Sequence, residues 1–322
     1  MGPAKIVPEA EALKQAVRVL GKGQPVAIPT ETVYGLAADA TDGEAVARIY
    51  ETKGRPAFNP LIIHVASPEM AEELAHFDEV SRHLAFAFWP GPLTMVLPAK
   101  KGSPVSALAT AGLETVAIRL PRGFARDLIA AFGKPIAAPS ANSSGRISPT
   151  TAEAVAADLG DRIPLIVDGG PARVGVESTI LSLDGRDIRL LRPGGLTVED
   201  IRAAIGVAPS MPGAPGGKVE APGQLASHYA PAARMRLDAA SVRPGEALLG
   251  FGPRRARGVK AAKAVLNLSQ KGDLREAAKN LFAHLAALDA ERPDRIVVEP
   301  VPEHGLGLAI NDRLRRAAAP RP

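Results

Sequence analysis

The 322-residue sequence contains no cysteine. This absence excludes disulfide bonds, zinc sites built from thiolates and cysteine nucleophiles, so any metal would be held by oxygen or imidazole. No apolar run reaches the roughly 18 residues of a membrane span, and the amino-terminal stretch MGPAKIVPEAEALKQ is too polar for a secretory signal. We therefore expect a cytoplasmic protein with no membrane partner.

Common catalytic signatures are also missing. The sequence has no GxxxxGKS/T loop, no HExxH, no GxSxG and no convincing GxGxxG. These absences argue against standard P-loop enzymes, zinc peptidases, esterases and dinucleotide oxidoreductases. What remains is a set of loops rich in Thr, Ser, Asn, Lys and Arg at the ends of apolar runs. Such loops suit the binding of polyanions and small polar molecules.

Charge is distributed unevenly along the chain. Residues 1–210 carry 21 basic and 23 acidic side chains, a net charge of −2, whereas residues 211–322 carry 18 and 11, a net charge of +7. The most basic loop contains Arg254, Arg255, Arg257 and Lys260, and it is either a solvated face or an RNA contact. The excess positive charge belongs to residues 211–322, so it does not by itself make residues 1–210 a nucleic-acid binder.

The length and the 46% hydrophobic content predict two globular domains. Short apolar runs alternate with amphipathic patterns along residues 1–206, which predicts an α/β domain with a mixed sheet. Pro and Gly are frequent in residues 207–231, and this composition predicts a linker. Residues 232–322 predict a small α/β domain.

Two polar clusters follow predicted strands. Residues 138–145, APSANSSG, come after an apolar run and form either an anion-binding loop or a Ser/Asn-rich turn. Lys53 and Arg55 flank a glycine after a predicted helix. Their charges either converge on one anion or form a solvated helix end.

Three further polar positions have open interpretations. Arg119 interrupts an apolar run, which places it at the rim of a sheet or beside a negative group such as an anionic ligand. His64 lies in a buried run, where a core histidine is the simplest interpretation. His228 and Tyr229 end the linker, which is either a spacer or a segment that closes over a site.

Six motifs occur in the order PTETVYGL, KGRPAFNPL, FWPGPLT, PSANSSG, ESTI and LLRPG. Together they resemble the YrdC-like domain of threonylcarbamoyl-adenylate synthases. APGQLASHYAP and the region after it resemble the two-domain members of that family. The resemblance implies a YrdC-like twisted mixed sheet with flanking helices, a linker that covers the active site, and a smaller Rossmann-like α/β domain.

The resemblance also implies a reaction. L-threonine, bicarbonate or CO2, and ATP would give L-threonylcarbamoyl-adenylate and pyrophosphate, with Mg²⁺ held by the ATP phosphates and by no protein side chain. A tRNA-modifying threonylcarbamoyl transferase would then use the adenylate to form N6-threonylcarbamoyladenosine in tRNA. No enzyme nucleophile is needed, which suits a chain without cysteine.

Site residues follow from the same resemblance, position by position. The residues implied to be catalytic are Lys53, Arg55, Ser140 and Asn142; the two basic residues would meet the ATP phosphates, and Ser140 and Asn142 would orient the reacting groups. Those implied to bind threonine are Thr32, Tyr34, His64, Arg119, Ser140 and Ser178. Those implied to bind ATP are Lys53, Arg55, Asn59, Thr115, Asn142, Ser148, Arg192, His228 and Tyr229.

An RNA-binding module of YrdC-like fold without synthase activity is the alternative, because a concave cleft can hold a phosphate backbone. The net charge of −2 in residues 1–210 argues against this alternative. A weak tRNA contact is compatible with either function.

Overall fold

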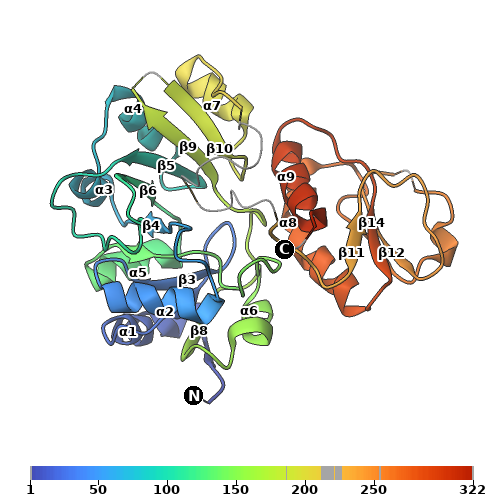
Figure 1. The fold of residues 1–322 in the computed structure, drawn as a ribbon, viewed down its shortest axis with the longest axis horizontal. Coiled ribbons are helices and arrows are strands. Elements are labelled where there is room, and N and C mark those ends of the chain that lie inside the picture. The colour runs from blue at the N-terminus through green and yellow to red at the C-terminus, as the bar shows by residue number, and fades with distance from the viewer. Residues whose placement is uncertain (1, 186, 212–220, 222–226, 254, 321–322) are drawn as a thin grey trace.

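Two β-sheets organise the chain, one before residue 211 and one after residue 227 (Figure 1). The computed structural model describes residues 2–185, 187–211, 221, 227–253 and 255–320. Within these residues the first sheet has ten strands, and their spatial order is β1 (Lys5–Pro8), β8 (Leu165–Asp168), β2 (Val26–Ile28), β3 (Gly35–Asp39), β7 (Ile136–Ala137), β4 (Ile62–His64), β6 (Thr115–Arg119), β5 (Leu93–Pro98), β9 (Thr179–Asp184) and β10 (Asp187–Arg192).

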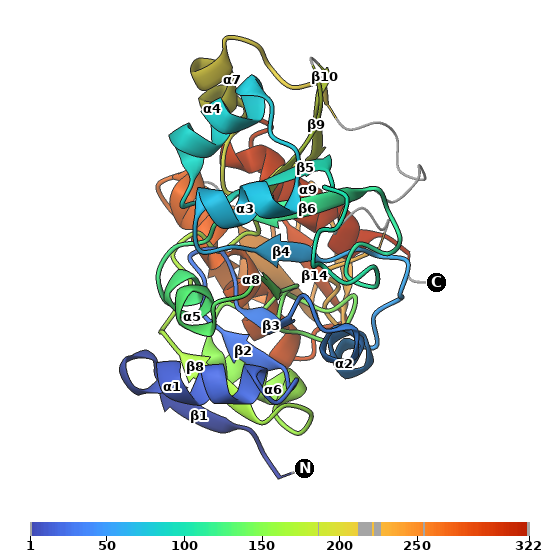
Figure 2. The same cartoon turned by 90° about the vertical axis from the view of Figure 1, so that its left-hand side faces the viewer.

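This large sheet is mixed, as the sequence predicts. The pairs β1–β8, β2–β8, β4–β6 and β5–β9 are parallel, and the other pairs are antiparallel. Figure 2 shows the sheet running from β1 at one end to β10 at the other. The helices that accompany it are α1 (Glu9–Leu20), α2 (Gly43–Lys53), α3 (Pro68–Leu74), α4 (Glu79–Phe88), α5 (Phe124–Phe132), α6 (Ala152–Leu159) and α7 (Val198–Ile205).

Helices cover both faces of the sheet near β2, because its strand residues alternate between two apolar clusters. Val26 and Ile28 pack with α1 and α5, whereas Ala27 between them packs with α2 and α6. This alternation follows from the two-residue period of a strand. The sheet is thus held from both sides, and its strand-end loops start from fixed positions.

Side-chain caps set where several helices begin. Asp42 accepts a hydrogen bond from the Glu44 amide at 2.9 Å and starts α2, and Thr151 caps α6. Thr197 forms a capping box with Asp200 at the start of α7. Each cap satisfies amides that have no partner within the helix.

The second sheet has four parallel strands in the described residues, in the order β11 (Arg234–Arg236), β14 (Arg295–Val298), β12 (Glu246–Gly250) and β13 (Val265–Asn267). A 3₁₀ turn covers Val259–Ala261, and the helices are α8 (Leu274–Ala290) and α9 (Leu306–Ala318). This arrangement confirms the smaller Rossmann-like α/β domain.

The two domains share an apolar core. Val33 and Val176 of the first domain belong to the same buried cluster as Leu281 and Phe282 of α8. A Cβ atom placed on Gly175 would lie 2.3 Å from the Cα atom of Lys279, so only glycine permits this close approach. The helices α8 and α9 therefore dock directly against the large domain (Figure 1).

The predicted boundaries 1–206, 207–231 and 232–322 stay a prediction. Residues 212–220 and 222–226 of the linker lie outside the described residues, as does Arg254 of the basic loop. No helix in the described part of the chain has the length and apolar content that crossing a membrane requires.

Candidate active site

One cavity lies where the strand-end loops of the large sheet meet residues 228 and 229. Its walls come from the segment after β2, from β4 and β6, from the loop after β7, and from residues beside β9 and β10. Ten of the fifteen residues assigned from the sequence line this cavity, namely Thr32, Tyr34, Arg55, His64, Arg119, Ser140, Ser178, Arg192, His228 and Tyr229.

Backbone hydrogen bonds hold the PSANSSG loop against the start of β3 and the residue before it. The Leu36 amide donates to the Pro139 carbonyl at 2.7 Å, and the Ala141 amide donates to the Tyr34 carbonyl at 2.8 Å. Gly145 then turns the chain with a φ of 80°. These bonds place Ser140 at the cavity wall.

Lys53 is buried behind this loop, with 3% of its surface exposed. Its Nζ atom donates to the Ser140 carbonyl at 2.5 Å and to the Asn142 carbonyl. Burial, together with the nearby charge of Arg55, holds the pKa of Lys53 well below its usual range. The interpretation as a solvated helix end is therefore wrong for this residue.

Two arginines also point their donors at backbone carbonyls. Arg55 donates from Nη2 to Pro60 at 2.8 Å and from Nε to Asn59 at 3.2 Å, and burial lowers its pKa to about 10. Arg192 donates from Nη2 to the Ser178 carbonyl at 2.8 Å, and burial lowers its pKa as well. Both guanidinium groups keep their positive charge at neutral pH.

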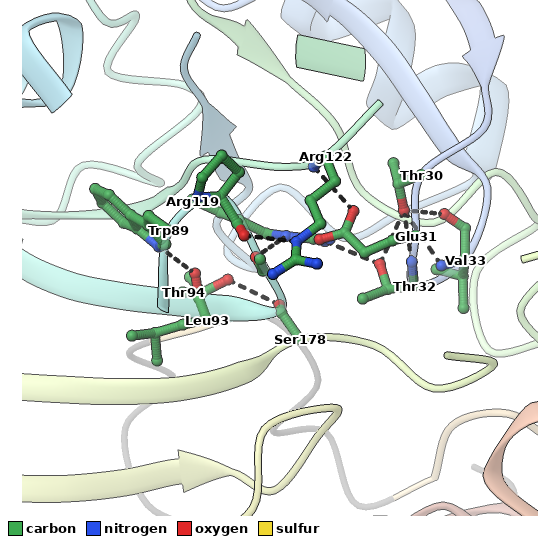
Figure 3. A network of polar contacts seen from close by, with 12 residues as sticks. Thr30, Glu31, Thr32, Val33, Trp89, Leu93, Thr94, Arg119, Arg122 and Ser178 are labelled. Carbon is green, nitrogen blue, oxygen red and sulfur yellow. Dashed lines mark hydrogen bonds and ion pairs between the residues drawn. The ribbon is translucent and has the colours of Figure 1, made fainter. Parts of the chain in front are cut away.

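Arg119 has a negative partner within the protein, as the network in Figure 3 shows. Its Nη2 atom lies 2.7 Å from Oε1 of Glu31, and both side chains are more than nine-tenths buried. Its Nη1 atom donates to the Thr32 hydroxyl at 2.9 Å. The Glu31–Nη2 approach lacks hydrogen-bond alignment and acts through charge. No local feature of the sequence marks Glu31 as the partner of Arg119 in this site.

The hydroxyl of Thr32 and the ring of His64 both offer acceptor atoms. Thr30 Oγ1 donates to the Val33 carbonyl at 2.6 Å, so the 2.9 Å contact between Thr30 and Thr32 has Thr32 as donor. One lone pair on Thr32 then stays open after the bond from Arg119. His64 Nδ1 lies 3.3 Å from the Ile62 carbonyl, which makes Nδ1 the donor and leaves Nε2 as an acceptor.

Glu177 is a second site residue without a sequence assignment of its own. It lines the cavity, accepts a hydrogen bond from Ser148 Oγ at 2.6 Å, and accepts another from Arg313 Nε at 2.9 Å. Burial opposes its ionisation, but the charges of Arg313 and Arg192 lower its pKa to about 2. The carboxylate is therefore ionised and neutralised within the protein.

The charges of the site do not balance. Glu31 and Glu177 each neutralise one guanidinium group. Within the described residues, Lys53, Arg55 and Arg192 contact backbone carbonyls and form no ion pair. Three buried basic side chains without carboxylate partners among the described residues, two of them charged guanidinium groups, make this region suitable for a polyanionic ligand.

His228 and Tyr229 form the wall contributed by the end of the linker. Their rings meet edge to face with centroids 4.1 Å apart, and the Ala230 amide donates to the Gly145 carbonyl at 2.8 Å. Burial, reinforced by the cations around the site, lowers the pKa of His228 to about 3. The segment thus lies directly on the PSANSSG loop.

Five assigned residues do not line the cavity. Lys53 and Asn142 lie behind the loop wall, and Ser148 lies behind Glu177. The side-chain amide of Asn59 is buried without a hydrogen-bond partner among the described residues. Thr115 lies at the start of β6, away from Arg119 at its end, and the structure does not bring it to the cavity.

His64 makes folding stability depend on pH. Burial, together with the charge of Arg119, lowers its pKa from 6.5 to about 3, so the unfolded chain binds more protons between these values. The stabilisation is complete above pH 6.5 and decreases as the pH falls. We expect His64 alone to cost about 2 kcal/mol between pH 7 and pH 5. Denaturant unfolding of the wild type and of His64→Gln at both pH values measures this difference, and an equal decrease in both proteins would contradict it.

Comparison with known proteins places both halves of the chain. Residues 18–194 match the Sua5/YciO/YrdC family model, described as "Telomere recombination". Residues 196–319 match the model described as "Threonylcarbamoyl-AMP synthase, C-terminal domain".

Full-length relatives show the same agreement. The threonylcarbamoyl-AMP synthase of Bacillus subtilis is 44% identical, with 96% of this chain and 93% of the relative covered. That of Pyrococcus abyssi is 42% identical, with 96% and 94% covered. The crystal structure of P. abyssi Sua5 complexed with L-threonine has a TM-score of 0.89 and 40% identity, and the match covers 98% of both chains. The chain belongs to the threonylcarbamoyl-AMP synthase family.

Proposed function

We propose that the cavity forms L-threonylcarbamoyl-adenylate from L-threonine, bicarbonate or CO2, and ATP, with release of pyrophosphate. The observation that carries this proposal is a set of three buried basic side chains, which form no ion pair among the described residues, beside a group of hydroxyls and a neutral histidine. The cations suit the phosphates of ATP, and the neutral groups suit an amino acid. Family membership supports threonine and ATP as the substrates.

Threonine is proposed to bind at the side of the cavity formed by Thr32, His64, Arg119 and Ser178. Arg119 would contact the carboxylate of the substrate, because its Nη1 atom already reaches Thr32 within the cavity wall. The open lone pairs of Thr32 and of His64 Nε2 suit N–H donors of the substrate. Tyr34 would contribute its ring, since its hydroxyl donates to the Gly170 carbonyl at 2.8 Å.

ATP is proposed to bind at the side formed by Lys53, Arg55 and Arg192. The buried amide of Asn59 beside Arg55 would gain a partner there, because its side-chain atoms have none among the described residues. Ser148 and Thr115 are proposed to bind the nucleotide beyond the phosphates. Of these assignments Thr115 has the weakest geometric support, because it lies away from the cavity.

The proposed chemistry needs positioning and charge neutralisation. The amine of threonine adds to CO2 to give a carbamate and a proton. A carbamate oxygen then attacks the α-phosphorus of ATP, and the bond to the β-phosphate oxygen breaks as pyrophosphate leaves. Ser140 and Asn142 would orient the reacting groups, and no side chain forms a covalent bond to the substrate.

Magnesium is proposed to enter with ATP. In the part of the chain that the structure describes, no three carboxylate or imidazole groups gather as metal ligands, and Glu31 and Glu177 are each engaged by a guanidinium group. The basic side chains of the site therefore suit the phosphate oxygens of ATP better than they suit a bare metal cation. When bound to the phosphates, Mg²⁺ supplies charge neutralisation for the leaving pyrophosphate.

His228 and Tyr229 are proposed to belong to a linker that closes over the occupied site. Both residues line the cavity, and the Ala230 amide bonds to the PSANSSG loop. Their proposed role is to exclude water from the carbamate and to contact the nucleotide. The linker would open to admit ATP.

An omission experiment tests the proposed function. Pyrophosphate release is measured with ATP, threonine, bicarbonate and Mg²⁺ together, and with each left out in turn. We expect release only in the complete mixture, with threonylcarbamoyl-adenylate as the product. Release that is unaffected by omission of threonine would contradict the proposal. Tight, salt-dependent RNA binding without turnover would instead favour the RNA-binding module.

The product is proposed to pass to a tRNA-modifying threonylcarbamoyl transferase. A weak tRNA contact through the basic loop of Arg254, Arg255, Arg257 and Lys260 also stays a prediction from the sequence, as does a cytoplasmic location.

A further inference from the structure

One guanidinium group of the C-terminal domain reaches the edge of the catalytic cavity. Arg313 lies on α9 and is 0% exposed, and it heads the fully buried side chains in size. It does not line the cavity itself. Its partner Glu177 lines the cavity, and its partner Pro193 directly follows Arg192, which also lines the cavity.

Arg313 bonds to two segments of the large domain at once. Its Nε atom donates to Glu177 Oε2 at 2.9 Å, and its Nη1 atom donates to the Pro193 carbonyl at 2.5 Å. Glu177 directly precedes Ser178, and Pro193 directly follows Arg192. Arg192 in turn donates to the Ser178 carbonyl at 2.8 Å. Arg313 therefore bonds to the neighbours of both Ser178 and Arg192. Ser178 is proposed to bind threonine, and Arg192 is proposed to bind the nucleotide.

The same guanidinium group supports the wall formed by the linker. Its Cζ atom lies 5.4 Å from the centre of the Tyr229 ring, within the range of a cation–π contact. Tyr229 has a φ of 63°, a conformation that non-glycine residues keep only when their surroundings impose it. Its ring also packs on Phe282 of α8 at 5.5 Å.

The position of Arg313 depends on how the domains dock. Asp312 Oδ2 accepts a hydrogen bond from Arg313 Nη1 at 2.9 Å and helps to aim the group. The Arg316 carbonyl, one turn further along α9, accepts the His228 amide at 3.2 Å. Movement of α9 would therefore displace Arg313 and the His228 backbone together.

We infer that Arg313 is a positioning residue through which the C-terminal domain fixes Ser178, Arg192 and Tyr229 in the catalytic cavity. It contacts no proposed substrate, so it acts through Glu177, the Pro193 carbonyl and the Tyr229 ring. Its effect on turnover rests on the proposed function. Its effect on the order of the linker segment does not.

Steady-state kinetics of Arg313→Met test the inference. We expect kcat/KM for threonine to fall about 10–100-fold, with both a higher KM and a lower kcat per folded molecule, because contacts to both substrates are misplaced. Arg315→Met is the matched control, since Arg315 lies on the same helix in a half-exposed pair with Glu303. We expect the control to match the wild type. Wild-type kcat and KM in folded Arg313→Met would overturn the inference.

Two more variants keep the test decisive if Arg313→Met folds poorly. Arg313→Lys keeps the charge, but its single ammonium group cannot bond to Glu177 and to the Pro193 carbonyl as the planar guanidinium group does. We therefore expect it to recover folding and only part of kcat/KM. The pair Arg313→Met/Glu177→Gln removes both charges, and we expect losses that are clearly less than additive. Full activity of Arg313→Lys, or additive losses in the pair, would overturn the inference.

Hydrogen exchange supplies a readout that needs no activity. The His228 amide donates to the Arg316 carbonyl, and the Ala230 amide donates to the Gly145 carbonyl. We expect them to exchange at least tenfold faster in Arg313→Lys than in the wild type and Arg315→Met. Unchanged exchange would overturn the inference, whereas a wild type without threonine-dependent turnover would contradict only the proposed function.

Discussion

Replacing Lys53 with methionine is expected to reduce threonine-dependent pyrophosphate release by about 10²–10³-fold. Its amino group donates hydrogen bonds to the carbonyls of Ser140 and Asn142, and Lys53 is one of three basic side chains of the site that form no ion pair among the described residues. Methionine has a similar length and no charge. The variant therefore loses the hydrogen bonds that hold the PSANSSG loop, and under the proposed function it also loses a basic group behind the phosphate site.

The same substitution is expected to change the melting temperature little, because removal of a disfavoured buried charge offsets the loss of the bonds to the Ser140 and Asn142 carbonyls. Burial lowers the pKa of Lys53, which means that the folded protein disfavours this charge relative to water. Loss of activity without loss of stability identifies a residue that is retained for function. Lys134→Met is the control, because Lys134 is half-exposed and pairs with Asp39 outside the cavity lining, and we expect its turnover to change less than twofold. A Lys53→Met protein as active as this control would show that the buried cation has no role in turnover.

Arg119→Met is expected to lower the free energy of unfolding by about 3–5 kcal/mol, because it leaves the buried Glu31 carboxylate without its partner. Glu31→Gln/Arg119→Met removes both charges and is expected to recover most of that loss. Denaturant unfolding measures both values. The exposed pair Arg315–Glu303 is the control, and its disruption by Arg315→Met should cost less than about 1 kcal/mol.

The double variant also separates stability from substrate binding. If Arg119 contacts threonine, the double variant should have a KM for threonine at least tenfold above that of the wild type even though its stability is restored. A double variant with restored stability and a normal KM would show that Arg119 is only the structural partner of Glu31. A double variant as unstable as Arg119→Met would contradict the importance of the ion pair.

The sequence predicts the cavity well where the signal is local. A polar cluster directly after a buried strand identifies the PSANSSG loop and Thr32, because strand ends at one edge of a sheet lie close together. The mixed α/β fold, the smaller Rossmann-like domain and the synthase family are likewise confirmed. These features depend on alternation and motif order, which a single sequence contains.

Long-range partners are the part that the sequence does not reveal. Glu31 lies between two threonines that attract attention, and only the pairing of β6 with its neighbours brings Arg119 to it. Arg313 belongs to a basic helix with no local feature that separates it from Arg315 or Arg316. Its contact with Glu177 spans 136 residues of sequence. The position of Arg119 within an apolar run predicts a negative neighbour, but the sequence does not indicate which residue that neighbour is.

Strand β3 is hard to predict from the sequence for a different reason. Its sequence GLAAD is small, and every residue is buried, so neither the alternation nor the bulk that marks a strand is present. The strand nevertheless connects the two halves of the sheet through β2 and β7. It also carries Gly35, which lines the cavity.

The most direct test of the central claim is a crystal structure of the chain with L-threonine and a non-hydrolysable ATP analogue. We expect threonine against Thr32, His64, Arg119 and Ser178, and the phosphates within hydrogen-bond distance of Lys53, Arg55 or Arg192. A second cavity of about 370 Å³, lined by Glu9, Arg122 and Phe124 among others, provides the competing location. Threonine bound only in that second cavity, or phosphates away from all three cations, would contradict the account.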